Sequence, residues 1–258
     1  MRQELIRLKK ILSILLLMGM VISMGSGLKS QVKAEVSDTD SSSTTSGTEE
    51  KKVVVIDAGH QTRAMSATEP IGPGSKTRKA KVTGGTSGCS THLPEYKLNL
   101  QVAKKLKKEL TARGYKVVMV RTKNDVTLSN VDRAKVANKK KADAFIRIHA
   151  NSANSSAVKG ALTIAPTSGN KYMTKKNRNA SQNLSKKVLK AFCKATGAKN
   201  RGVMYTDTMT GINWCKVPVT IVEMGFMSNP SEDRKMASAS YQKKIVKGIA
   251  NGIDAYLK

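Results

Sequence analysis

The chain has 258 residues and a formal net charge of +28, from 46 basic and 18 acidic side chains. That length suits one domain of catalytic size with appendages. Its three cysteines match neither a disulfide scaffold nor a CxxC metal site, which excludes both classes. A field of this sign favours a polyanionic partner, and composition alone leaves nucleic acid, anionic lipid and an anionic cell-wall polymer open.

The first 34 residues have the features of a secretory signal peptide. Four basic residues among the first ten precede an uncharged apolar segment, residues 11–23, and small residues suit cleavage after Ala34. The uncharged run extends to Leu28, which reaches the lower limit for a membrane span. An uncleaved anchor is therefore the alternative, and it is the one contact with a membrane that we expect. In both cases the rest of the chain is expected to be exported.

Residues 35–50 consist mainly of Ser, Thr, Asp and Glu and contain no basic side chain. Such a segment is too polar to form a core, so we predict a linker. From residue 51 the composition becomes that of a globular domain, which we expect to extend over residues 51–258.

Strands and helices alternate along this domain. Apolar, β-branched runs predict strands from residue 53 up to His60 and over residues 116–121, 144–149, 160–164, 202–206 and 218–222. Apolar residues at helical spacing predict helices from Pro94 to Gly114, from Ser129 to about Lys140, over 180–195 before Gly197, and over 241–257. Residues 61–93 show no periodicity, and we expect a long loop. This alternation predicts an α/β fold, with a largely parallel sheet and helices on both faces.

Three chemically active side chains follow predicted strands. His60 and His149 end the first and third runs, and Glu223 follows the last. Because parallel strands end at one edge of a sheet, these side chains are expected to converge where open α/β folds bind ligands. Glu95 joins them if the helix that it begins follows the first strand directly in space. Two imidazoles and a carboxylate, with a fourth position open to water, form the ligand set of catalytic zinc sites.

Glu223 is the candidate for the general base that a hydrolase of this type also needs. It follows the apolar residues 219–222 and precedes Met224 to Met227. Poorly hydrated surroundings raise the pKa of a carboxyl group toward a useful range. Such a base takes a proton from the activated water and later gives it to the leaving amine.

Two positions leave alternatives open. His92 lies three residues before Glu95, and it either supplies a ligand instead or merely lines the loop. Asp57 either orients a ligand histidine or forms a turn. The HExxH, GxSxG and GxxxxGKS motifs are absent from the sequence, so the enzyme classes that depend on them are not indicated.

Four motifs occur in order along the domain: Ile56-Asp57-Ala58-Gly59-His60-Gln61, Pro94-Glu95-Tyr96-Lys97-Leu98-Asn99-Leu100, Ile146-Arg147-Ile148-His149-Ala150-Asn151 and Ile221-Val222-Glu223-Met224-Gly225-Phe226-Met227-Ser228-Asn229. Together they resemble the zinc-dependent N-acetylmuramoyl-L-alanine amidases, the amidase type 3 catalytic domain family, which cut bacterial peptidoglycan. The resemblance implies a mixed sheet of about six strands flanked by helices. It also implies one catalytic Zn²⁺ held by His60, Glu95 and His149, with Glu223 as the catalytic glutamate.

The substrate that the resemblance implies is the amide between the lactyl group of N-acetylmuramic acid and the L-alanine of the stem peptide. The basic charge then has a partner in peptidoglycan and the anionic polymers of the wall, rather than in nucleic acid. We expect a secreted monomer that acts at the cell wall. One rival hypothesis is a zinc peptidase or deacetylase that acts on another wall bond. A second rival, a non-catalytic polyanion-binding protein, leaves the placement of the histidines unexplained.

Overall fold

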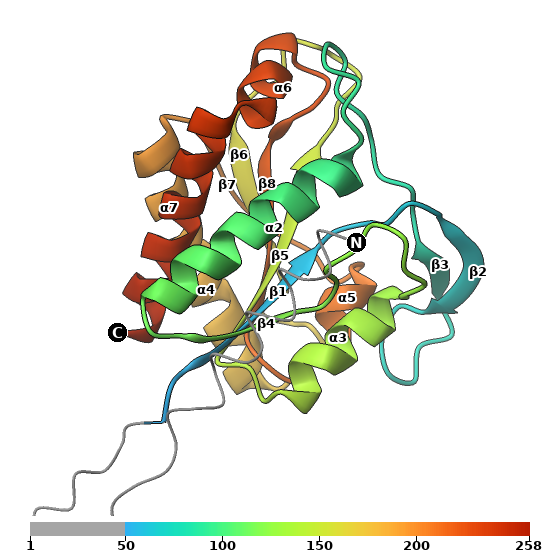
Figure 1. Ribbon diagram of the computed structural model, residues 1–258. Coiled ribbons are helices and arrows are strands. Elements are labelled where there is room, and N and C mark those ends of the chain that lie inside the picture. Colours follow the sequence, from blue (N-terminus) through green and yellow to red (C-terminus); the bar gives the residue numbers. More distant parts are fainter. Residues whose placement is uncertain (1–49) are drawn as a thin grey trace, which may run out of the picture. The chain divides into compact units, whose positions relative to one another are not determined.

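Six strands form the central sheet of the computed structural model, which describes residues 50–258 (Figure 1). In spatial order they are β4 (Lys116–Met119), β1 (Val53–Ala58), β5 (Ala144–Asn151), β8 (Val219–Phe226), β6 (Ala161–Ala165) and β7 (Asn200–Tyr205). β1 pairs in parallel with β4 and β5, and β5 pairs in parallel with β8. β6 runs antiparallel to β8 and parallel to β7. The sheet is therefore mixed and mostly parallel, which confirms the predicted fold class.

The signal peptide predicted over residues 1–34 lies outside the described residues, as does the predicted linker except for residue 50. Everything that the structure describes belongs to one compact unit. Within residues 50–258, no helix combines the length and the apolar character that crossing a bilayer requires.

Helices cover both faces of the sheet. One face carries α2 (Glu95–Ala112), α4 (Lys175–Thr196) and α7 (Ala239–Leu257), and the other carries α3 (Asn130–Lys139) and α5 (Thr210–Asn213). A short helix, α6 (Pro230–Ala237), connects β8 to α7. Ile56, Ile146 and Ile148 of the strands belong to the core cluster that contains Leu106 of α2 and Phe192 of α4. This face is a continuous apolar core.

The opposite face of the sheet changes character along the strands. Alternate residues of a strand point to opposite faces. Near the amino ends, this face presents apolar residues that pack with α3 and α5: Val55, Phe145 and Val219. Toward the carboxyl ends, the same alternation presents polar residues: Asp57, Arg147, His149 and Glu223. The sequence thereby places its reactive groups on one half of one face.

Several helix ends follow the predicted signals. Ser129 caps α3 in a capping box with Asp132, in which each side chain accepts from the backbone N–H of the other. α4 ends at Gly197, whose φ of 71° lies in the left-handed region that glycine favours. α2 begins at Glu95 directly after Pro94, so this carboxylate stands at a helix amino terminus.

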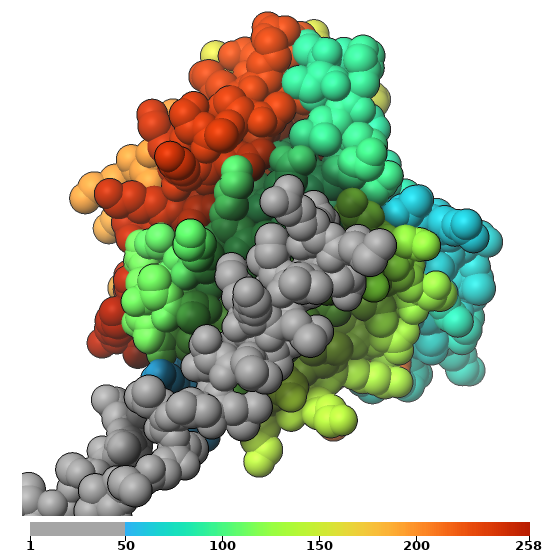
Figure 2. Space-filling model, in the orientation of Figure 1, coloured from blue at the N-terminus to red at the C-terminus, as the bar shows by residue number. Residues whose placement is uncertain are grey.

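Residues 61–93 are not the uninterrupted loop that their composition predicts. They contain an antiparallel hairpin, β2 (Met65–Pro70) and β3 (Arg78–Val82), which lies beside α3 at the surface (Figures 1 and 2). Most of its residues are exposed or half-buried, so no apolar alternation marks the strands. The hairpin depends on distant partners: Asn130 Nδ2 donates to the carbonyl oxygen of Lys81 at 2.8 Å. The sequence also does not predict α5 and α6.

Leu106 allows a test of the core packing on α2, because its side chain is fully buried. We expect Leu106→Ala to lower the free energy of unfolding by about 2–5 kcal/mol, through lost burial and the cavity left behind. Lys107→Ala, on the exposed side of the same helix, is expected to change it by less than about 0.5 kcal/mol. Urea denaturation of both variants measures the difference, and equal stabilities would contradict this placement of α2.

Candidate metal centre

Three side chains from separate elements meet beside the carboxyl end of β1. His60 follows β1, Glu95 begins α2 and His149 lies within β5. His60 Nε2 lies 3.1 Å from His149 Nδ1, and each nitrogen lies 3.2 Å from Glu95 Oε1. A tetrahedral zinc site with bonds of about 2.0–2.1 Å places neighbouring ligand atoms about 3.3 Å apart. The triangle therefore has the size of one face of such a site.

The turn after β1 fixes the orientation of His60. Its Nδ1 lies 2.8 Å from the carbonyl oxygen of Thr83, which can only accept, so Nδ1 carries the proton. In the neutral ring Nε2 therefore turns a lone pair toward the triangle, as a metal ligand must. Gly59 precedes it, and a Cβ at Gly59 would overlap the ring of His149. Only glycine permits this approach of the two segments.

Glu95 is held by three N–H donors. Its Oε1 accepts from Asn99 Nδ2 and from the backbone N–H of Ala150, both at 3.1 Å, and Oε2 accepts from the N–H of Thr86 at 3.1 Å. Burial would raise the pKa of Glu95, but hydrogen bonds and charge at His149 and His60 hold it well below its usual range. The carboxylate is therefore an anion at neutral pH.

The two imidazoles differ in their response to burial. Burial lowers the pKa of His149 to about 4, so this ring is neutral at pH 7. Burial also acts to lower the pKa of His60, but the hydrogen bond and charge of Glu95 outweigh it and leave the pKa raised. The proton that this shift favours lies on Nε2, which faces Glu95, and a metal ion bound there would displace it. One anionic oxygen and two ring nitrogens suit a divalent cation such as zinc.

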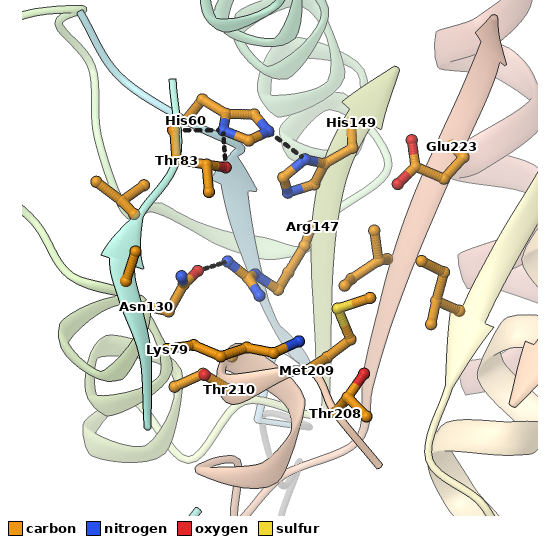
Figure 3. A pocket seen from close by; sticks show the side chains of 15 residues that line it. His60, Lys79, Thr83, Asn130, Arg147, His149, Thr208, Met209, Thr210 and Glu223 are labelled. Atoms are coloured by element: carbon orange, nitrogen blue, oxygen red, sulfur yellow. Dashed lines mark hydrogen bonds between the residues drawn. The ribbon is translucent and has the colours of Figure 1, made fainter. Parts of the chain in front are cut away.

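Glu223 of β8 lies in register with His149 of β5 and lines the same cavity, whose volume is about 500 Å³ (Figure 3). Burial raises the pKa of Glu223 to about 8, and the negative charge of Glu95 adds to the shift. Among the described residues, four buried side-chain atoms make no hydrogen bond, and two of them are Glu223 Oε2 and His149 Nε2. Buried polar atoms without partners are uncommon, so these two indicate a site that water or a ligand completes.

Asp57 contacts two buried arginines rather than a ligand histidine. Its Oδ1 accepts from Arg133 Nη1 at 2.7 Å, and its Oδ2 accepts from Arg147 Nε at 3.0 Å. Arg133 also donates to the carbonyl oxygens of Ala58 and His60, each at 3.1 Å. Burial would raise the pKa of Asp57, but the two guanidinium charges hold it well below its usual range. This ion pair network fixes the turn that carries His60.

The structure brings together the four residues that the sequence singles out: His60, Glu95, His149 and Glu223. His92 is exposed and lies outside the triangle. The strands continue past His149 and Glu223, which therefore lie inside β5 and β8 rather than at their ends. Arg147 also lines the cavity, although it is not among the site residues predicted from the sequence. The signal for it is a charged residue within an apolar run, two positions before His149 and so on the same face of the strand.

Comparisons of the sequence and of the fold with known proteins identify the same family. The family model for N-acetylmuramoyl-L-alanine amidase matches residues 54–255. The N-acetylmuramoyl-L-alanine amidase LytC of Bacillus subtilis (strain 168) is 31% identical over 166 residues, which are 64% of this chain and 32% of LytC. The chain thus spans about a third of the length of that relative.

Two solved structures are similar to this chain in fold, with nearly equal TM-scores. The catalytic domain of CwlV, an N-acetylmuramoyl-L-alanine amidase from Bacillus (Paenibacillus) polymyxa var. colistinus, is 32% identical, with a TM-score of 0.64. That match covers 80% of this chain and 98% of the CwlV domain. An N-acetylmuramoyl-L-alanine amidase from Clostridium difficile 630 is 27% identical, with a TM-score of 0.65 and coverage of 80% of this chain and 97% of that one.

Removal of the charge on Asp57 tests the network beneath the turn. We expect Asp57→Asn to lower the free energy of unfolding at pH 7 by about 3–5 kcal/mol, because two buried guanidinium groups lose their anion. Folding lowers the pKa of Asp57, so its stabilisation is present above the unfolded-state value of 3.8 and is lost as the pH falls further. Urea denaturation at pH 7 measures the loss. Asp125→Asn, at an exposed carboxylate, is the matched control. Equal changes in the free energy of unfolding for the two variants would show that the network does not stabilise the fold.

Proposed function

Because the chain belongs to the N-acetylmuramoyl-L-alanine amidase family, we propose that it is a zinc-dependent hydrolase of bacterial peptidoglycan. The bond that it cleaves is the amide between N-acetylmuramic acid and the L-alanine of the stem peptide. The observation that carries this proposal is the triangle of His60 Nε2, Glu95 Oε1 and His149 Nδ1, beside the buried carboxyl group of Glu223. A ligand set and a separate carboxylic base are the parts that metal-assisted amide hydrolysis needs.

His60, Glu95 and His149 would hold one Zn²⁺, which when bound supplies a Lewis acid that activates water and polarises the amide carbonyl. Glu223 acts first as a base, and its carboxylate takes a proton from the attacking water. The same group then acts as an acid and delivers the proton to the nitrogen of the departing L-alanine. The raised pKa of Glu223 in its buried position supports the second step, because the carboxyl group must hold its proton until the amine departs. The positive charge of a bound cation would favour the carboxylate form that the first step needs.

We propose that residues 1–34 are a signal peptide, that residues 35–50 are a linker and that residues 51–258 are the catalytic domain. Export through the signal peptide brings the enzyme to the cell wall, where its substrate is. The net charge of +28 supports attraction to the anionic polymers of the wall. We propose that the enzyme acts as a monomer.

A digest of purified cell walls tests which bond is cut. We expect the zinc-loaded protein to release stem peptides with new amino-terminal L-alanine, identified by mass spectrometry, and a chelator to abolish the release. Free D-alanine, diamino acid or acetate as the product would instead support a peptidase or a deacetylase. Undiminished release in the presence of the chelator would contradict a metal-dependent mechanism.

Glu223→Gln separates proton transfer from metal binding. We expect kcat to fall by about 10²–10⁴-fold, because the amide side chain cannot accept the proton of the attacking water. Zinc content, measured by elemental analysis, is expected to equal that of the unmodified protein, whereas His149→Ala is expected to lower it. Asp125→Asn is the control for activity. An active Glu223→Gln protein would refute the assignment of the base.

A further inference from the structure

The cavity beside the candidate metal centre has a cationic wall. Arg147 of β5 and Lys79 of β3 both line it, and Figure 3 shows the two side chains extending into the cavity below the histidines. Glu223 is the one acidic side chain among the described residues that line it. The lower part of the cavity therefore carries positive charge, and no carboxylate of the described residues lines that part.

The charge of Arg147 is only partly neutralised inside the protein. Asp57 is shared between Arg147 and Arg133, so one carboxylate faces two guanidinium groups. The side chain of Arg133 is 1% exposed and that of Arg147 is 4% exposed. Excess positive charge in a buried position is unfavourable unless a further anion pairs with it. The positive charge at Arg147 therefore favours binding of an anionic ligand in this part of the cavity.

Arg147 also has hydrogen-bond donors to spare. Its Nε donates to Asp57, and its Nη2 donates to Asn130 Oδ1 at 2.8 Å. A guanidinium group has five N–H donors, and Nη1 makes no hydrogen bond to the described part of the chain. Nη1 is also not among the buried atoms that lack a partner, so it is accessible from the cavity. This nitrogen can donate to a ligand.

Gly211 of α5 leaves room for Nη1 of the Arg147 guanidinium. A Cβ at this position would overlap Arg147 Nη1, so a larger residue would push the group out of its place. The combination of a fixed guanidinium, an uncommitted nitrogen and a lysine on the same cavity wall suits a carboxylate, which can accept a charge-assisted hydrogen bond from Nη1.

The substrate proposed above carries its free carboxylates on one side of the scissile bond. The carboxyl of the lactyl group is consumed in the amide, so the free carboxylates belong to the stem peptide that leaves. We propose that Arg147, assisted by Lys79, binds a carboxylate of this stem peptide and so selects peptides in which it is free. This inference rests on the proposed function, since it names the part of that substrate that the cationic wall recognises.

Two synthetic muramyl peptides test the inference, one with the carboxylates of its stem peptide free and the other with all of them converted to carboxamides. For the zinc-loaded wild type, we expect kcat/KM to be about tenfold to a hundredfold higher with the free carboxylate, as a charge-assisted hydrogen bond provides. Arg147→Gln should abolish this preference, and Lys79→Ala, at an exposed position, should reduce it. The readout is the ratio of kcat/KM for the two peptides within each variant, so a general loss of activity in a variant does not enter the comparison.

Lys76→Ala is the matched control, because Lys76 is exposed and does not line the cavity; its preference should equal that of the wild type. Equal cleavage of both peptides by the wild type would overturn the inference and leave the amidase proposal standing. A preference that persists in Lys79→Ala and Arg147→Gln would also overturn it. Cleavage of neither peptide would overturn the amidase proposal itself, and the inference with it. If Arg147→Gln does not fold, the comparison of the two peptides and the Lys79→Ala variant still decide the question.

Discussion

The buried carboxylate of Glu95 is the constraint on which the site depends. It lies at the amino terminus of α2, it accepts the N–H of Ala150 on β5, and it touches both imidazoles. A buried anion requires donors or positive charge around it. Three N–H groups supply part of that requirement, and the two rings turn nitrogens toward the same oxygen. A divalent cation bound between these atoms would satisfy the remainder.

The sheet supplies the second condition, which is a fixed frame for groups that lie far apart in sequence. One face is apolar throughout and packs under α2, α4 and α7. The other face is apolar near the amino ends of its strands and polar near the carboxyl ends. Asp57, with Arg133 and Arg147, lies where this face changes from apolar to polar. Arg133 donates hydrogen bonds to the carbonyl oxygens of the turn at His60. The position of the first ring thus depends on a buried ion pair network rather than on local turn propensity.

The sequence predicts the parts of this architecture that have strong local signals. Long apolar runs mark β1, β5 and β8, so their pattern alone places His60, His149 and Glu223 at one side of a sheet. The start of α2 after Pro94 is predicted as well, but whether Glu95 reaches the histidines depends on where that helix lies in space, which the local pattern does not decide. The hairpin β2–β3 lacks such signals, because its exposed strands are held by contacts with α3. The role of Arg147 is hidden for a related reason. Its partners Asp57 and Asn130 depend on strand register and helix docking, which periodicity alone does not reveal.

Crystals of the zinc-loaded protein, measured at the zinc absorption edge, would show where the metal binds. We expect one anomalous peak at bonding distance, about 2.0–2.2 Å, from His60 Nε2, Glu95 Oε1 and His149 Nδ1. A correctly folded protein with zinc bound elsewhere, or with no zinc at these three atoms, would contradict this expectation.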